Sequence, residues 1–142
     1  MVAEIEIEGA EKLFIFEKHR LESFKSWPFA DDQACSIKNM AEAGFYWCGN
    51  ERETDTAACF VCDKILDGWE ATDDPWKEHA KHAPQCMFVK YRKPEKDFTV
   101  EEFLDLFGNV IKGHLNKIGM SLKKRIRQTY EKHMNKFLSS CT

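Results

Sequence analysis

The sequence predicts an α+β fold in two parts, a small domain of short helices and strands followed by one long C-terminal α-helix. Cysteine and histidine residues recur at metal-ligand spacing in the first part. Apolar residues recur every three or four positions in the last part. The charge also differs: residues 1–93 carry 12 Lys/Arg and 18 Asp/Glu, whereas residues 94–142 carry 9 and 6. The −6 and +3 balances indicate two parts with different roles.

The composition excludes several classes of protein. A hydrophobic fraction of 43% disfavours disorder, and a net charge of −3 excludes a uniformly basic nucleic-acid coat protein. The apolar runs fall short of the roughly 20 residues that cross a bilayer, so we expect no membrane contact. The N-terminus lacks a secretory signal, so we expect the six cysteines to be reduced and to favour metal ligation over disulfides. No cysteine is convincingly paired with a base, and we therefore expect no enzyme.

The elements of the first part begin with helices. Residues 1–12 are acidic and weakly patterned, which predicts a mobile arm. The pattern over 13–24 predicts a helix that ends before Trp27-Pro28, because the residue before proline avoids the α region. Ser36 is a candidate N-cap of a short second helix, and Gly44 occupies its C′ position.

Strands are predicted next. Phe45 to Trp47 is typical of a strand, 49–57 of a polar loop, and 58–66 of a hairpin interrupted by a tight cysteine turn. Together they predict a short three-stranded antiparallel sheet. Asp73-Asp74-Pro75 predicts the start of a helix that ends near His82.

A charged linker, residues 91–98, separates this domain from the long helix, predicted over 99–140 with Thr99 and Glu102 as a capping box. At 1.5 Å per residue, some 39 residues span roughly 58 Å, more than the width of a ~90-residue globule. We therefore expect its apolar face to pack against partner helices. That face comprises Phe103, Phe107, Ile111, Leu115, Ile118, Leu122, Ile126, Tyr130, Met134 and Phe137.

The same helix is basic and contains glycines. Residues 110–138 carry eight Lys/Arg against Glu131 alone. This pattern indicates either a solvated face or attraction to acidic partner helices, DNA or microtubules. Gly108, Gly113 and Gly119 each disfavour a helix by roughly 1 kcal/mol, so a kink near Gly119 is the alternative to one unbroken rod.

A tetrahedral metal site is predicted in the domain. Cys59 and Cys62 form a Cys-x2-Cys turn, His79 follows on a helix, and Cys86 lies just beyond that helix. Three thiolates and a neutral imidazole suit Zn²⁺ and leave no open position, which is typical of a structural site. Such an ion contributes on the order of 10–16 kcal/mol to folding. The alternative is buried cysteines and a surface histidine.

A dozen or more residues around this site match one protein family in order. They are Arg20, Phe24, Trp27-Pro28, Ala43-Gly44-Phe45-Tyr46, Cys59, Cys62, Gly68-Trp69, Asp74-Pro75, Glu78-His79, Cys86 and Phe88. Over residues 13–90 the chain resembles the BIR domain of inhibitor-of-apoptosis proteins. The resemblance implies one zinc-stapled domain, with Arg20 as a buried structural residue. No second cysteine cluster exists, so ubiquitin ligase activity is not supported.

The resemblance also implies a groove beside the third strand that captures the free N-terminus of a partner, usually beginning with Ala. The strand edge would pair with the peptide, carboxylates would hold its α-ammonium group, and Trp69 would cover its small side chain. The peptide-contact residues so implied are Glu53, Ile65, Leu66, Asp67, Trp69, Asp73 and Glu78. Asp73 is alternatively only a helix cap, and Trp69 only a core residue.

In single-BIR members, the ligand resembles a histone N-terminal tail phosphorylated on its third residue, threonine. The phosphate would meet Lys64 and His82, whose alternative role is solvated surface. The long helix would join an inner-centromere scaffold protein and borealin, and so direct an Aurora-type kinase. Implied locations are the nucleus and centromeres, the spindle midzone in late mitosis and the cytoplasm in interphase. Free protein would form a homodimer, with Phe98 and Val100 as candidate contacts.

A second functional class is inhibition of apoptosis, by action on caspases or by binding Ala-starting pro-apoptotic peptides. Sequence-specific DNA binding by the metal region is disfavoured, because that region is acidic.

Overall fold

The computed structural model describes residues 13–141. The predicted N-terminal arm, residues 1–12, lies outside the described residues. Contacts divide the chain into a first unit that ends at Phe107 and a second that begins at Gly108. Within the described residues, no helix is long and apolar enough to span a membrane.

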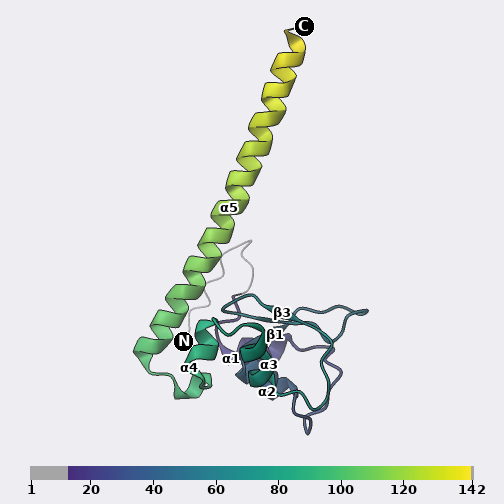
Figure 1. Ribbon diagram of the computed structural model, residues 1–142, viewed down its shortest axis with the longest axis vertical. Coiled ribbons are helices and arrows are strands. Elements are labelled where there is room, and N and C mark those ends of the chain that lie inside the picture. Colours follow the sequence, from purple (N-terminus) through teal and green to yellow (C-terminus); the bar gives the residue numbers. More distant parts are fainter. Residues whose placement is uncertain (1–12, 142) are drawn as a thin grey trace. The chain divides into compact units, whose positions relative to one another are not determined.

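The first unit is built on a three-stranded antiparallel sheet in the order β1-β2-β3. Strands β1 and β3 are labelled in Figure 1. The strands are β1 (Phe45–Trp47), β2 (Ala57–Cys59) and β3 (Ile65–Leu66). Phe45 faces Cys59 across the first pair, and Ala58 faces Ile65 across the second. The predicted sheet is confirmed, with β3 at an edge.

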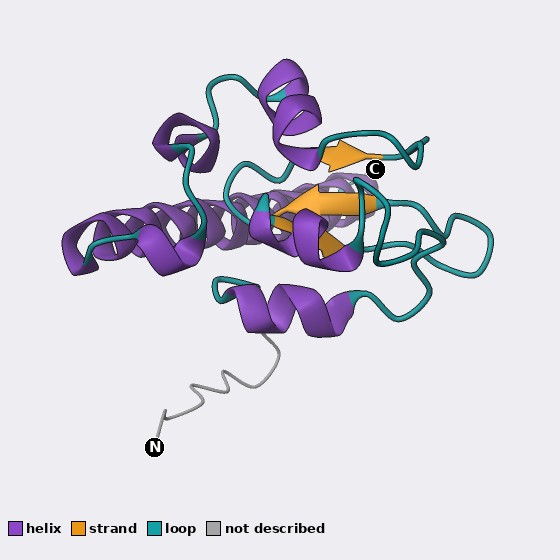
Figure 2. Ribbon diagram, turned by 90° about the horizontal axis from the view of Figure 1, so that it is seen from below, coloured by secondary structure: helices purple, strands orange, loops and turns teal. Residues whose placement is uncertain are grey.

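Short helices surround this sheet (Figure 2). They are α1 (Glu17–Ser23), α2 (Ile37–Glu42), α3 (Pro75–His82), α4 (Met87–Tyr91) and the 3₁₀ turn η1 (Glu95–Asp97). The long helix α5 (Val100–Ser140) follows. At Gly108, Gly113 and Gly119 a Cβ atom would meet no other atom within 4 Å, apart from the backbone of the helix itself.

The predicted helix caps are present. The Ser36 hydroxyl accepts a hydrogen bond from the Asn39 amide at 3.4 Å. The Asp74 carboxylate accepts from the amide of Trp76 at 3.0 Å, and Pro75 occupies the first helical position. At α5, the Glu102 carboxylate accepts from the Thr99 amide and the Thr99 hydroxyl accepts from the Glu102 amide, which is the reciprocal capping box.

One predicted helix boundary was wrong. Helix α1 begins at Glu17 rather than at residue 13, because Phe14 adopts a left-handed φ of 44° and Phe16 is extended. The carbonyls of Phe14 and Ile15 instead accept hydrogen bonds from the Arg20 guanidinium. Part of the segment predicted as linker is also helical, because Tyr91 ends α4 and η1 follows it.

Buried Arg20 confirms the structural role expected for it. Its side chain has no exposed surface, and Nε donates to the carbonyl of Ala41 at 2.9 Å. The guanidinium lies 4.3 Å from the Phe60 ring centroid and 3.6 Å from a Glu95 carboxylate oxygen. Burial lowers the pKa of Arg20 to about 10, so it is still protonated at neutral pH. The ion pair between Arg20 and Glu95 therefore holds η1 against the domain.

Gly44 lets the two halves of the domain core approach closely. Its φ is +94°, and a Cβ atom there would lie 2.9 Å from the ring of Phe88. Phe88 in turn packs edge-on to Phe60 at a centroid distance of 5.3 Å. A side chain at position 44 therefore meets both backbone strain and a fully packed ring.

Candidate metal centre and peptide-binding edge

Four predicted ligands converge although they come from separate elements. Cys59 ends β2, Cys62 lies in the following turn, His79 lies on α3 and Cys86 caps α4. Their ligand atoms all lie within 4.8 Å of one another. The turn is shaped by Asp63, whose φ is 60° and whose amide donates to the carbonyl of Cys59 at 3.0 Å. Short loops thus bring four ligands from 28 residues of chain to one point.

The spacing of the ligand atoms suits one zinc ion. The Sγ atoms of Cys59 and Cys86 are 3.9 Å apart, and Cys62 Sγ is 3.6 Å from His79 Nε2. Zinc–sulfur bonds of about 2.3 Å and zinc–nitrogen bonds of about 2.0 Å in a tetrahedron place such ligand pairs roughly 3.5–3.8 Å apart. The group therefore fits a structural Zn²⁺ with four protein ligands, as predicted.

His79 is oriented by contacts behind the site. Its ring is fully buried, and Nδ1 lies 2.8 Å from the carbonyl of Ala43. A carbonyl only accepts, so Nδ1 carries the proton and Nε2 presents its lone pair to the other ligands. The Phe45 ring lies 4.8 Å away and excludes water on that side.

The pKa values of two of the ligand thiols, Cys59 and Cys86, are shifted in opposite directions. Burial raises the pKa of Cys59 well above its ordinary value. Hydrogen bonds from Cys59 and Cys62 lower the pKa of Cys86 to about 3. A divalent cation reverses the penalty at Cys59, because it neutralises the charge that burial disfavours.

The edge strand β3 is open to a partner. Within the described residues it pairs only with β2, through Ala57 opposite Leu66 and Ala58 opposite Ile65. Ile65 is 60% exposed, Lys64 is exposed and Leu66 is half-buried. An exposed edge with unpaired backbone groups is the template for strand addition.

The predicted acidic anchors differ in how they are engaged. Asp67 is exposed beside the end of β3. One Asp73 oxygen accepts from the Glu70 amide at 2.8 Å, so this carboxylate supports its own turn as well. Glu78 lies 3.3 Å from both Lys81 and His82, which places the predicted phosphate contact His82 beside a carboxylate on α3. Glu53 is exposed on the β1–β2 loop.

Trp69 lies largely within the core. It is only 7% exposed, its indole N–H donates to the carbonyl of Leu66 at 3.3 Å, and its ring packs edge-on against Phe45 and Trp27. The core role considered for this residue is therefore present. Its attachment to Leu66 also couples the core to the end of β3.

Asp55 supports this edge and was missed by sequence reasoning. One of its carboxylate oxygens accepts from the amides of Gly68 at 2.9 Å and Trp69 at 3.2 Å. It thereby holds the chain just after β3. Its place in a polar loop carried no signal of this contact, because the two segments meet only after the hairpin has folded.

The predicted partner face of α5 is exposed from Leu115 onward. Leu115, Ile118, Leu122, Ile126, Tyr130, Met134 and Phe137 are between 38% and 64% exposed. In the first unit, Phe103 instead stacks on Phe16, and Leu106, which the stripe omitted, is buried at 2% exposure. Phe103 and Phe107 are half-buried, as is Ile111 at the start of the second unit.

The two candidate dimer contacts differ. Phe98 packs against Phe88 and Tyr91 at centroid distances of 5.9 and 5.1 Å and is half-buried. Val100 is 77% exposed. The intramolecular contacts of Phe98 leave Val100 as the more accessible of the two.

Comparison with known proteins agrees with this architecture. The family described as Inhibitor of Apoptosis domain (BIR) matches residues 20–90. Proteins named Baculoviral IAP repeat-containing protein 5, or survivin, are 43% identical in Rattus norvegicus and 42% in Mus musculus. Those matches cover 78% and 80% of this chain and 78% and 81% of the relatives. A relative from Xenopus laevis, Baculoviral IAP repeat-containing protein 5.1-B, is 47% identical over 69% of this chain and 61% of its own length. The chain belongs to the BIR-domain family of inhibitor-of-apoptosis proteins.

Proposed function

We propose that this protein is a non-enzymatic subunit of a chromosomal passenger complex that reads a phosphorylated histone tail. The observation that carries the proposal is the open β3 edge with Lys64 beside it and acidic groups at its far end. An extended peptide would add to β3, its α-ammonium group pairing with Asp67 and Asp73. A phosphothreonine two residues later would meet Lys64 and His82, and a basic second residue would meet Glu53.

The long helix supplies the second half of the proposal. Its exposed apolar face is too long for one small domain to cover, and it would complete a bundle with helices of the inner-centromere scaffold protein and borealin. Through them an Aurora-type kinase would be directed to centromeres and later to the spindle midzone. In interphase the protein would reside in the cytoplasm, with free copies pairing through a surface that includes Phe98 and Val100.

Calorimetry with the zinc-loaded protein tests the proposed binding of a phosphorylated peptide. A peptide beginning Ala-Arg-phosphothreonine should bind more tightly than its unphosphorylated form, because a charge-assisted contact to phosphate contributes about 1.5–3 kcal/mol. Lys64→Ala should remove most of the difference. Lys38→Ala, which removes an exposed lysine on α2, should preserve it. Equal affinity of the two peptides for the unmodified protein would sink the proposal.

Inhibition of apoptosis is the second candidate, and the matched family description favours it. In this case the groove would take Ala-starting pro-apoptotic peptides, or the protein would act on caspases. Co-purification from mitotic cells separates the two: recovery of the kinase with its scaffold supports the first, and recovery of caspases alone supports the second. Inhibition of a purified effector caspase by nanomolar protein would reverse the order.

A further inference from the structure

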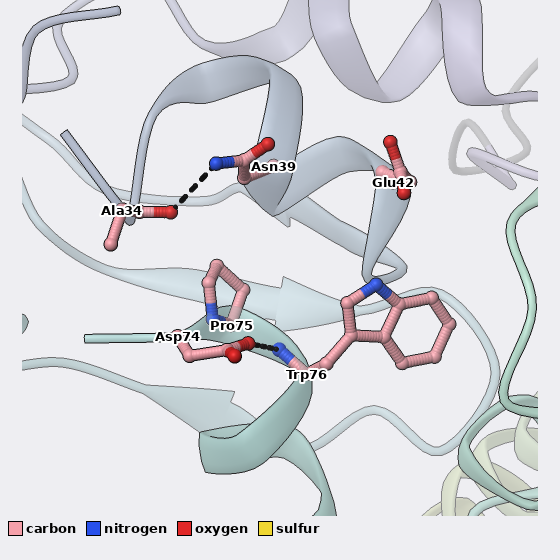
Figure 3. A pocket seen from close by; sticks show the side chains of 6 residues that line it. All are labelled: Ala34, Asn39, Glu42, Asp74, Pro75 and Trp76. Carbon is pink, nitrogen blue, oxygen red and sulfur yellow. Dashed lines mark hydrogen bonds between the residues drawn. The ribbon is translucent and has the colours of Figure 1, made fainter. Parts of the chain in front are cut away.

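A small depression lies between α2 and the start of α3, lined by Ala34, Asn39, Glu42, Asp74, Pro75 and Trp76 (Figure 3). None of these residues belongs to the metal site or to the predicted peptide edge. The floor is apolar where Pro75 is buried. The rim carries two carboxylates and no basic side chain.

Trp76 is distinctive among the four tryptophans. The indole N–H groups of the other three donate to backbone carbonyls: Trp27 to Cys35, Trp47 to Thr54 and Trp69 to Leu66. No such acceptor is found for Trp76 within residues 13–141, and its indole nitrogen lies on the side of the depression where Glu42 stands (Figure 3). One face of its ring is stacked on Phe88 at 5.3 Å, so the ring is held in place.

Glu42 contributes a charge without a counterion. It is half-buried at the end of α2, and within the described residues no hydrogen bond or ion pair engages its carboxylate. Asp74, across the depression, uses one oxygen to cap α3, while the other lies 3.9 Å from the exposed Lys77. Asn39 donates its amide to the Ala34 carbonyl at 2.9 Å, so its side-chain oxygen is available as a further acceptor. The depression thus offers several acceptors and one donor.

We propose that this α2–α3 depression binds an arginine residue of a partner polypeptide, separately from the groove at β3. A guanidinium group presents five N–H donors in a planar fork, which suits two carboxylates and an amide oxygen around a small space. Its plane stacks on an indole and its stem packs on proline. The free indole N–H takes the backbone carbonyl of the same segment. A bare cation would satisfy only the acceptors.

The test uses the zinc-loaded full chain labelled with ¹⁵N and the peptide acetyl-Gly-Arg-Gly-amide. The Trp76 indole resonance, assigned by its loss in Trp76→Phe, should shift and saturate below roughly 10 mM peptide. Acetyl-Gly-Gln-Gly-amide should produce no saturable shift, and acetyl-Gly-Lys-Gly-amide should bind more weakly than the arginine peptide. An arginine peptide that gives no saturable shift, or a glutamine peptide that gives the same one, overturns the proposal.

A pair of charge-matched variants makes the result specific. Glu42→Gln should weaken binding of the arginine peptide by about fivefold. Glu51→Gln, at an exposed position on the β1–β2 loop, should change it less than twofold, although the net charge changes equally. Zinc content and the dispersion of the amide spectrum establish that both variants are folded. Equal weakening by the two variants would mean that only overall charge attracts the peptide, which contradicts a site at this place.

Discussion

At the scale of single residues, this domain depends on positions where the chemistry or the available space allows only one type of residue. His79 must be neutral, buried and turned by Ala43, and Gly44 must have no side chain. The average hydrophobicity of the sequence indicates neither requirement. Both depend on where neighbouring elements place single groups: the Ala43 carbonyl beside His79 and the Phe88 ring beside Gly44.

Gly44→Ala should destabilise the zinc-loaded protein by about 1–3 kcal/mol, because the new Cβ meets Phe88 and the φ of +94° strains an L-residue. Thermal or urea unfolding measures the loss. Gly108→Ala is the matched control, since nothing lies near a Cβ there and alanine favours a helix by about 1 kcal/mol over glycine. A Gly44→Ala variant as stable as the unmodified protein would contradict the close contact.

His79→Ala should lose the zinc ion and, with it, the folded domain. Three thiolates remain, but the buried Nε2 ligand is gone, and zinc binding is coupled to folding. Metal content by mass spectrometry of the intact protein checks this. His82→Ala, three residues further along α3, should keep one zinc per chain. Loss of metal from both variants, or from neither, would argue against the assigned ligands.

At the scale of elements, helix caps and turns determine the position of the β3 edge more than the length of the strand does. Strand β3 has only two residues, yet its position follows from the cysteine turn before it and the Asp55 carboxylate after it. Helix α5 begins with a complete capping box, to which Lys93 adds an ion pair with Glu102 at 2.6 Å. The start of the long helix is therefore linked by an ion pair to the beginning of the predicted linker.

The Glu102 carboxyl should titrate below the ordinary glutamate range. The hydrogen bond from Lys93, followed by that from the Thr99 amide, lowers its pKa. A lowered folded-state pKa means that this contribution to stability is complete above the ordinary glutamate pKa. It is lost as the pH falls through the lowered value. Carbon-detected NMR titration of the side-chain carboxyl measures the pKa.

In that titration, Lys93→Ala should move the Glu102 pKa upward, because the largest cause of the shift is removed. Lys90→Ala, an exposed position on α4, should leave it in place. An unchanged titration curve in Lys93→Ala would show that the ion pair does not persist in solution.

At the scale of the whole molecule, the two units use different means of stabilisation. The first buries aromatic rings around a site suited to one metal ion, whereas the second is a helix whose large apolar residues are exposed from Leu115 onward. A lone helix gains little from its own hydrogen bonds, and its stability depends on what packs against it. The proposed partners would supply that packing.

Replacing Leu122 and Ile126 together by Asp should abolish co-purification of the scaffold protein and borealin. Burying two carboxylates in an apolar bundle costs several kcal/mol, and both side chains are now more than half exposed. Lys123→Asp and Arg127→Asp, on the same turns, form the charge control and should weaken recovery less. Zinc content should stay at one per chain in all variants. Full recovery with the apolar pair replaced would contradict the assigned face.

The sequence by itself determined the zinc ligands, the antiparallel sheet and the caps of α2, α3 and α5. These follow from local spacing: a Cys-x2-Cys turn, alternating residues and an N-cap side chain that accepts from an amide two or three residues later all act within a few positions of the chain. The apolar stripe on α5 was equally predictable, because its period of nearly four residues persists from Phe103 to Phe137.

Only the tertiary structure decided contacts between segments far apart in the chain. Arg20 meets Glu95, Asp55 holds the chain after β3, Phe98 packs on its own domain and Trp76 faces Glu42 across a depression. The late start of α1 has the same origin, since a buried guanidinium takes the carbonyls that a helix would otherwise use. Such pairings depend on which surfaces the folded core brings together. No local sequence pattern encodes which distant segments will then lie close to each other.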